Sequence, residues 1–454
     1  MKTEGLEEKK SGFIADPYFL ALIGAGLFVR VVATLLTDDA AVLTADDKLY
    51  VERVEQWMQG EGFETGGFVR PPLYFALLAV VWQLCDALGI EWVLAAKLLQ
   101  CVAGAATALP LYASAHALAG RRTARFAVAF LLFDPTLVAY AHLIWPETVY
   151  SLIVAIVFDG IRRLAPDRTT RALVLGALCG AAMLLKPAFG LFTLVLAASW
   201  LIRFGPRPAL RLALIFGGTA AIVISPWVVR NQLLYGPAIV IENQGAYNFW
   251  IGNDPRPPIR IFREWYSLGD PVLRSRVAVA MGAQAIADEP RRFAANSVRR
   301  AINLWGFEYF VIRNLTLNGY GEVEKRTILF FFWVLQIGYM IAFLTAAIGL
   351  PTSLRNPQFR VLLGYAVLFT LVTAAMVTTT RFRVPFHFAM AIASGVGLSH
   401  LLERRIGRRE LVALGIAVLI LLSSANRPLF RKIGSGDFER VNELRRYSWA
   451  FFRY

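Results

Sequence analysis

The residues best suited to chemistry gather in one short stretch near the N-terminus. Asp46 and Asp47 are adjacent, Tyr50 follows about one helical turn later, and Arg70 precedes two prolines. A carboxylate can take a proton from a hydroxyl group, and a guanidinium can hold a phosphate through two parallel hydrogen bonds. These residue types therefore suit proton transfer and the binding of an anion.

The composition indicates where such chemistry would take place. The chain has 454 residues, of which 57% are apolar and 17% are charged. A typical soluble domain is roughly 45–50% apolar and about 25% charged. This balance excludes a disordered chain, a coiled coil and a disulfide-stapled secreted domain, and a cytosolic enzyme needs a more charged surface. We therefore expect an all-α polytopic membrane protein.

Apolar segments that could cross a bilayer follow one another along the chain. A spanning helix needs about 20 mostly apolar residues. The candidate segments are 17–36, 92–118, 125–142, 148–161, 172–185, 188–202, 210–229, 327–350, 360–379, 384–402 and 411–424. A further apolar run, 73–85, is shorter, and its placement decides the orientation of every later segment.

Basic linkers between these segments indicate the orientation. Sixteen arginines and three acidic residues occur in five linkers, 121–125, 162–171, 203–211, 355–360 and 403–410, with Glu403 and Glu410 at the ends of the last. Arginine-rich loops stay on the cytoplasmic side. All five linkers fall on that side if 73–85 lies in the membrane interface instead of spanning. We therefore predict eleven crossings, with the N-terminus inside and the C-terminus outside.

This topology divides the chain into four parts. They are an N-terminal transmembrane module at 1–229 with a first outer loop at 37–91, an outer cap at 230–326, C-terminal transmembrane helices at 327–424, and an outer tail at 425–454. The apolar spacing predicts an amphipathic helix over 47–59 in the first outer loop. In the cap it predicts helices over 272–288 and 290–304, so that about half of the cap is helical.

The outward side carries an unusual set of charged residues. A charge at the centre of a membrane helix costs at least about 2.5–3.5 kcal/mol, so charges at membrane depth are functional candidates. In the predicted topology the following residues converge on the outer side: Asp46, Asp47, Arg70, Glu147, Lys186, Arg230, Arg381 and Arg383. The topology is derived from the linkers alone. The position of these charged residues on one side is therefore independent evidence for a functional site.

The order of several motifs resembles that of GT-C superfamily glycosyltransferases. The pattern DDxxY at 46–50, followed by a Gly-rich stretch and RPPLY at 70–74, is similar to the first outer loop of one branch. That branch contains the protein O-mannosyltransferases and the lipid A aminoarabinose transferases, and many members have Glu at the position of Asp47. Further matching motifs are WPE at 145–147, LKP at 185–187, PWxxRN at 226–231, NQGAYN at 243–248 with GN at 252–253, and RFRVP at 381–385. The resemblance extends over roughly residues 17–400.

The resemblance implies a GT-C-type helical bundle that moves a sugar from a polyprenyl-phosphate carrier to an acceptor hydroxyl on the outer face. Asp46 is the first candidate for the general base, and Asp47 is the alternative. Inversion of the anomeric carbon follows if the base and the phosphate flank opposite faces of the sugar. The candidates for holding the lipid phosphate are, in order, Arg70, Lys186, Arg383, Arg230 and Arg381.

Several of these residues also have a structural interpretation. Lys186 could be a lysine that snorkels at a helix end, and Arg230 could be an interfacial anchor. Glu147 could pair with a cation, hold the acceptor or bind a metal. Within the cap, Asn248 and Asn253 are substrate-binding candidates by resemblance, as is Tyr50 in the first outer loop. We expect no resident cofactor, and the sequence indicates no metal site although a divalent metal is compatible with it.

The expected partners are a lipid-linked sugar donor, a glycan, lipid or protein acceptor, and the bilayer. The formal charge of +15 does not indicate nucleic acid, because much of it lies in the arginine linkers. Two alternatives remain at this stage, a lipid or polysaccharide transporter and a glycan ligase or polymerase that uses a lipid diphosphate. The arginine-rich composition suits a bacterial inner membrane protein with its active site on the outer side.

Overall fold

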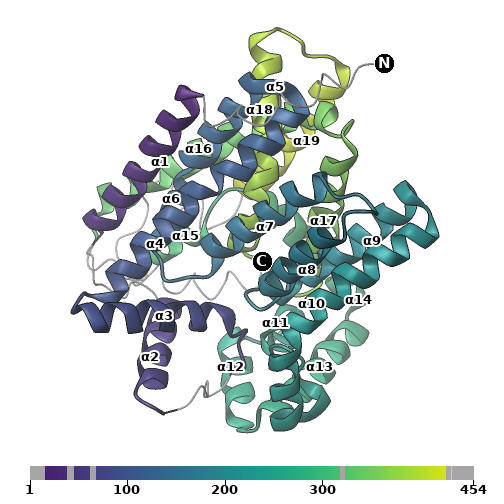
Figure 1. Ribbon diagram of the computed structural model, residues 1–454. Helices are drawn as coiled ribbons and strands as arrows, with labels where there is room; N and C mark the ends of the chain where they lie inside the picture. The colour runs from purple at the N-terminus through teal and green to yellow at the C-terminus, as the bar shows by residue number, and fades with distance from the viewer. Residues whose placement is uncertain (1–15, 38–44, 62–67, 317–322, 426–430, 432–454) are drawn as a thin grey trace.

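The computed structural model describes residues 16–37, 45–61, 68–316, 323–425 and 431, and the described part is built from helices (Figure 1). The α-helices are α1 Pro17–Leu36, α2 Ala45–Met58, α3 Leu73–Leu88, α4 Trp92–Ala106, α5 Ala108–Leu132, α6 Pro135–Ala141, α7 Glu147–Arg162, α8 Thr169–Met183, α9 Gly190–Phe204, α10 Pro206–Tyr235, α11 Gln244–Asn253, α12 Pro258–Ser267, α13 Pro271–Asp288, α14 Pro290–Trp305, α15 Phe310–Thr316, α16 Lys325–Ser353, α17 Pro357–Ala374, α18 His387–Leu402 and α19 Arg408–Ala425. Short 3-10 helices are η1 Pro187–Phe189, η2 Gly236–Ala238 and η3 Thr380–Phe386. The predicted all-α class is confirmed.

Seven helical stretches among the described residues are both long enough and apolar enough to cross a membrane, so the predicted number of eleven is not confirmed. These stretches are Pro17–Leu36, Trp92–Leu132, Pro187–Phe204, Pro206–Ala238, Lys325–Ser353, Pro357–Ala374 and Thr380–Leu402. Helices α7 and α8 have 16 and 15 residues and are shorter than a simple span.

The predicted span 125–142 is wrong, because this segment is not one continuous helix. Helix α5 ends at Leu132, and Asp134 then caps a separate short helix, α6, by accepting a hydrogen bond from the Thr136 backbone N–H at 2.8 Å. Pro135 fits the first turn of α6, where no N–H donor is needed. An aspartate cap followed by proline is a helix-start signal, and it overrides the apolar run around it.

The centre of the bundle is formed where α18 lies between α16 and α5. Gly349 of α16 and Gly397 of α18 meet so closely that a Cβ on either one would collide with the other helix's backbone. Gly395 of α18 approaches the Thr123 and Ala127 backbone of α5 in the same way. Small residues let helix backbones approach in a membrane bundle. These close contacts hold α18, the helix that follows η3, against α16 and α5.

Helices α2 and α3 form the predicted first outer loop. The amphipathic helix predicted over 47–59 is present as α2, and its Tyr50 side chain packs on Tyr74 and Phe75 of α3. With 16 residues, α3 is about 24 Å long, which is less than a bilayer's hydrocarbon core of about 30 Å. In Figure 1 it runs crosswise below α4, as an interfacial helix would.

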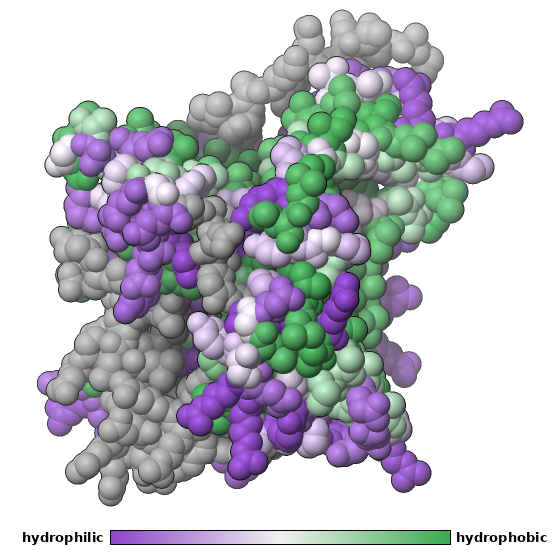
Figure 2. All heavy atoms as spheres, turned by 90° about the horizontal axis from the view of Figure 1, so that it is seen from below, coloured by the Kyte–Doolittle hydropathy of each residue, from purple (hydrophilic) through white to green (hydrophobic). Residues whose placement is uncertain are grey.

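Cap helices α11, α12 and α13 lie at the same end of the molecule as α2 and α3 (Figure 1). The helices predicted over 272–288 and 290–304 are confirmed as α13 and α14. The cap is more helical than predicted, because α11, α12 and α15 are also present, and α11 and α12 pack with α13 around a small aromatic core. Seen from this end, hydrophilic residues lie in several groups among hydrophobic ones (Figure 2).

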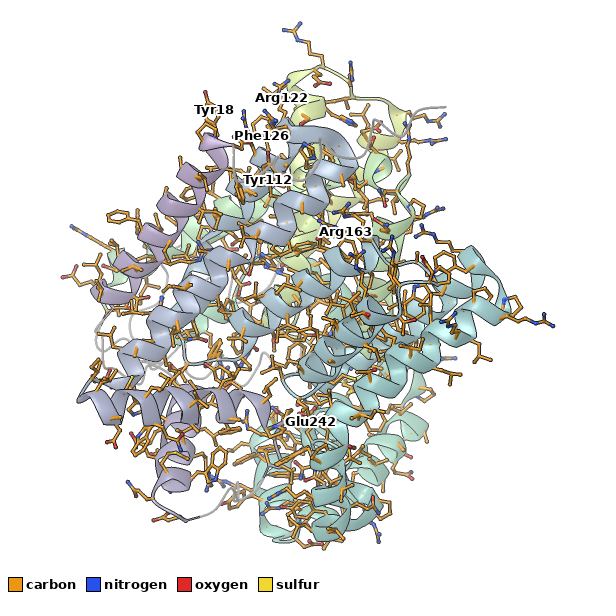
Figure 3. All side chains as sticks on the ribbon, in the orientation of Figure 1. Tyr18, Tyr112, Arg122, Phe126, Arg163 and Glu242 are labelled. Atoms are coloured by element: carbon orange, nitrogen blue, oxygen red, sulfur yellow. The ribbon has the colours of Figure 1, made fainter. Side chains whose placement is uncertain are left out.

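The basic linkers and the cap lie toward opposite ends of the bundle. Figure 3 shows Arg122 and Arg163 in its upper half and Glu242 in its lower half. Cysteine variants test whether this separation follows the bilayer. With an impermeant maleimide on intact cells, Arg122→Cys and Arg163→Cys are expected to stay unlabelled, whereas Ser267→Cys in the cap reacts. The native cysteines are buried and should give little background. Labelling of either arginine position from outside would contradict the predicted orientation.

Candidate functional site

Five charged residues from five separate segments meet at the end of the bundle that carries α2 and α3. They form what we call the ion-pair cluster: Asp46 in α2, Arg70 before α3, Glu147 at the start of α7, Lys186 between α8 and η1, and Arg381 in η3. All five were candidates from sequence. The structure thus brings five separate sequence motifs together in one cluster.

Arg381 is the centre of the cluster. Its Nε and Nη2 donate to the two carboxylate oxygens of Glu147, the latter at 3.0 Å, and its Nη1 donates to Asp46. The guanidinium carbon lies 4.0 Å from the centre of the buried Trp145 ring. A planar guanidinium can bind one carboxylate in a fork, reach a second and stack on an aromatic face. Lysine offers no such geometry.

The outer members of the cluster are cations. Lys186 Nζ lies 3.0 Å from a Glu147 oxygen, and Arg70 Nη2 lies 3.7 Å from an Asp46 oxygen. The charges therefore alternate from Arg70 through Asp46, Arg381 and Glu147 to Lys186. Among the described ion pairs, the two outer cations each contact a single carboxylate, Arg70 with Asp46 and Lys186 with Glu147. Such an arrangement suits a bound anion.

The charge of Asp46 is maintained by its neighbours. Burial disfavours its ionised form, but the charges of Arg381 and Arg70 outweigh burial and hold the pKa of the Asp46 carboxyl well below its usual range. Burial raises the pKa of Tyr50, one turn further along α2, to about 12. Tyr50 is therefore a neutral phenol at neutral pH, and its ring lies 5.8 Å from the Arg70 guanidinium.

Short backbone contacts position the two outer cations. The Val69 N–H donates to the Asn243 side-chain oxygen at 3.0 Å, and the Asn243 N–H donates back to the Val69 carbonyl at 3.3 Å. On the other side of Arg70, the Leu73 N–H donates to the Leu184 carbonyl at 3.2 Å. Pro187 prevents α8 from continuing and leaves Lys186 in an extended conformation. The segments carrying Arg70 and Lys186 are thereby joined.

Other candidates lie in different surroundings. Arg383 is fully buried in a separate network, where it pairs with Glu308 at 3.0 Å, donates to the Leu304 and Gly306 carbonyls, and stacks on Tyr339. The Arg383 side chain therefore joins η3 to the segment between α14 and α15.

Arg230, Asn248 and Asn253 also take no part in the ion pairs of the cluster. Arg230 hydrogen bonds to the Asn231 side chain and lies over Trp227 at 4.5 Å. Asn253 donates to the Phe249 and Ala375 carbonyls and so joins α11 to the end of α17, while Asn248 is a half-buried residue of α11. Asp47 is buried at the start of α2 beside the cluster.

Two charged residues near the cluster were missed by the sequence analysis. Arg313 of α15 is close enough for the charges of Asp46 and Arg381 to act on it, and burial lowers its pKa. Glu242, before α11, experiences the charges of Lys186 and Arg70, although burial raises its pKa. Neither residue belongs to a motif that stands out in the sequence. A charged residue flanking the NQGAYN run was the available signal for Glu242.

Metal binding is not indicated by the described residues. No group of three or more His, Cys, Asp or Glu side chains in this part of the chain is arranged to hold a metal ion. The expectation that the protein has no resident metal or cofactor stays a prediction.

Comparison with known proteins gives one family match and several structural matches. The family described as dolichyl-phosphate-mannose-protein mannosyltransferase matches residues 69–229. The Archaeoglobus fulgidus oligosaccharyltransferase in its apo form has a TM-score of 0.51 at 15% identity, with 94% of this chain and 57% of that chain covered. The same enzyme tethered with an acceptor peptide gives 0.50 at 14% identity, with 93% and 55% covered. The chain has the GT-C fold.

This GT-C chain spans just over half the length of the oligosaccharyltransferase chains it matches. ArnT from Cupriavidus metallidurans bound to undecaprenyl phosphate has a TM-score of 0.41 at 15% identity, covering 85% of this chain and 78% of that chain, which is too low to add to the fold assignment. No match is found among curated proteins. The matched family region contains Arg70, Glu147 and Lys186, so three members of the cluster lie inside it. The predicted GT-C-type fold is confirmed.

Proposed function

We propose that this GT-C protein is a membrane glycosyltransferase that moves a sugar from a polyprenyl-phosphate carrier to an acceptor hydroxyl outside the cytoplasm. The observation that carries the proposal is the ion-pair cluster, whose two outer cations, Arg70 and Lys186, each contact a single carboxylate at the end of a helical membrane bundle. The family match, whose name specifies a dolichyl-phosphate-linked donor, supports a lipid phosphate as the leaving group.

The leaving group of this reaction needs stabilisation of negative charge. When the bond from the anomeric carbon to the phosphate oxygen breaks, charge develops on the lipid phosphate, and fixed cations stabilise it without a proton. Arg70 and Lys186 are placed for this role because they occupy the two outer positions of the cluster. Arg70 Nε is buried and has no hydrogen-bond partner in the described structure, which leaves a donor for the phosphate.

The carboxylates of the cluster organise these cations. Glu147 holds both Arg381 and Lys186, and Asp46 holds Arg381 and faces Arg70. Their negative charges reduce the repulsion between the cations. Without these carboxylates, the protein would have to overcome that repulsion during folding. Sequence resemblance makes Asp46 a candidate for the base that takes the acceptor's proton, with inversion at the anomeric carbon as the outcome.

Transfer by the purified protein is the direct test. The full chain in detergent or liposomes is incubated with a panel of polyprenyl-phosphate sugars and with envelope lipids, glycans and peptides as acceptors. Transfer from at least one donor, with release of polyprenyl phosphate, is expected. A different result would assign the protein to transport. In that case no donor supports transfer, and intact lipid-linked sugar moves across the membrane in an energy-dependent way.

Replacing Lys186 by methionine is expected to lower kcat/KM for the lipid-linked donor by roughly a hundredfold, because one cation at the phosphate is lost. Lys186→Arg should retain more activity, since it keeps the charge. Steady-state kinetics at varied donor concentration measures both. Arg291→Met, on the exposed side of α14, is the matched control and should behave as the wild type. Equal activity of Lys186→Met and this control would remove Lys186 from the site.

A further inference from the structure

Glu242 is a carboxylate next to the ion-pair cluster that takes no part in its ion pairs. It is half-buried, in the segment between η2 and α11, and Figure 3 shows it beside the cap helices. Among the described residues no cation lies within ion-pair distance of its oxygens, whereas Asp46 and Glu147 are both paired. Its carboxylate is therefore available to a substrate.

The backbone around Glu242 is held firmly against the site. Its neighbour Asn243 forms the two hydrogen bonds with Val69 described above, which sets Glu242 beside the segment that carries Arg70. On the other side, the Trp227 indole N–H and the Asn231 side chain of α10 donate to the Ile241 carbonyl. A residue fixed on both sides can present its side chain in one position, as catalysis requires.

The charged groups that act on Glu242 are the two proposed phosphate cations. Lys186 and Arg70 favour its ionised form, and burial opposes them, with the result that the pKa of Glu242 is raised. Trp227 and Asn231, which contact the neighbouring Ile241, do not titrate. Glu242 is therefore near enough to both cations to feel their charges without forming an ion pair with either.

Two buried donors without hydrogen-bond partners belong to residues near Glu242. The Asn243 side chain is 3% exposed, and its Nδ2 has no hydrogen-bond partner in the described structure. Arg70 Nε is unpartnered in the same way. A buried donor without a partner is costly and is usually satisfied by a ligand or a water. Hydroxyl groups of a sugar or of its acceptor would supply the missing acceptors.

We propose that Glu242 is a further catalytic residue, the base that takes the proton of the acceptor hydroxyl. The inference rests on the proposed glycosyl transfer. The acceptor oxygen forms a bond to the anomeric carbon as its proton passes to a Glu242 oxygen. The bond from the anomeric carbon to the phosphate oxygen breaks, and its electron pair leaves with the polyprenyl phosphate, which Arg70 and Lys186 hold. Asp46 stays ionised and keeps Arg381 and Arg70 in place.

The test compares Glu242→Gln with Asp46→Asn over a range of pH, using whichever polyprenyl-phosphate sugar the wild type transfers. Glu242→Gln is expected to lower kcat by roughly 10²–10⁴-fold with little change in donor KM. Because a base must be deprotonated, wild-type kcat falls as the pH drops through the Glu242 pKa. This acidic decline should be absent from the residual activity of Glu242→Gln and present in Glu242→Asp, which should recover part of kcat.

Controls separate this inference from the proposed function. Glu264→Gln changes an exposed carboxylate of the cap and should transfer at the wild-type rate. An unchanged melting temperature for Glu242→Gln is expected because no ion pair is lost. If the wild type transfers sugar and Glu242→Gln retains its kcat and its acidic decline, Glu242 is not the base. Loss of that decline in Asp46→Asn would then assign the role to Asp46. A wild type that transfers nothing overturns the proposed function itself.

Discussion

Replacing Arg381 by methionine is expected to lower kcat by roughly a thousandfold or more while the protein stays folded. Arg381 is the residue that joins Asp46 to Glu147. Loss of one fixed charge-stabilising donor commonly costs about 10²–10³ in kcat. The three hydrogen bonds of Arg381 hold the two carboxylates that position Arg70 and Lys186, so its loss disturbs both proposed phosphate donors. Its removal also frees the two carboxylates. They can then turn toward Arg70 and Lys186 and occupy the N–H donors that would otherwise bind the phosphate.

The fold should survive this change because neither carboxylate loses its last partner. Glu147 keeps Lys186 at 3.0 Å, and Asp46 keeps Arg70 at 3.7 Å and is about one-third exposed. A buried charge becomes strongly destabilising when it is left uncompensated, and that does not occur here. Size-exclusion profile and thermal unfolding of Arg381→Met in detergent should therefore resemble those of the wild type.

Arg381→Lys is the informative companion variant. It keeps the charge, but an ammonium group cannot bind Glu147 in a fork and reach Asp46 in the same geometry. We therefore expect its kcat to remain well below that of the wild type, with donor KM closer to normal than in Arg381→Met. Single-turnover transfer at saturating donor measures the effect on the chemical step. Activity of Arg381→Met within tenfold of the wild type would contradict a central role for this residue.

The sequence analysis placed the candidate residues at one end of the molecule. Its order of the arginines as phosphate candidates, however, does not match their positions in the structure. The RFR motif placed Arg383 ahead of Arg381 as a phosphate candidate. In η3 the two side chains point in different directions, because residues two apart are about 240° apart around a 3-10 helix with three residues per turn. Arg381 faces the cluster, whereas Arg383 faces Glu308. A motif fixes the residues but does not fix which of them faces the site.

Contacts between distant segments were beyond the reach of sequence reasoning. Hydropathy identified the long helices, and proline located the break at Lys186. Glu242 gained its place through the hydrogen bonds between Asn243 and Val69, which are 174 positions apart. No local periodicity encodes such a pairing, and the single carboxylate before the NQGAYN run has no spacing signature. The Asp134 cap was overlooked because it interrupts an apolar run that hydropathy averages over.

Replacing Arg383 by methionine is expected to destabilise the protein by about 3–5 kcal/mol, because it leaves Glu308 buried without its charge partner. Both side chains of this pair are almost completely buried, and Arg383 also satisfies the Leu304 and Gly306 carbonyls. Thermal unfolding in detergent and the amount of folded protein recovered from membranes measure the effect. Arg381→Met, two residues earlier, should show little loss by the same measurements.

A second substitution separates the lost charge pair from lost packing around Arg383. In the Arg383→Met background, Glu308→Gln removes the uncompensated charge and keeps the shape of the side chain, so it should restore part of the stability. Recovery should be incomplete, because Glu308 also accepts hydrogen bonds from the Phe310 N–H at 2.8 Å and the Thr380 hydroxyl at 2.6 Å. If the double variant is less stable than Arg383→Met by the full effect of Glu308→Gln alone, the two residues act independently and the ion pair is not what stabilises η3.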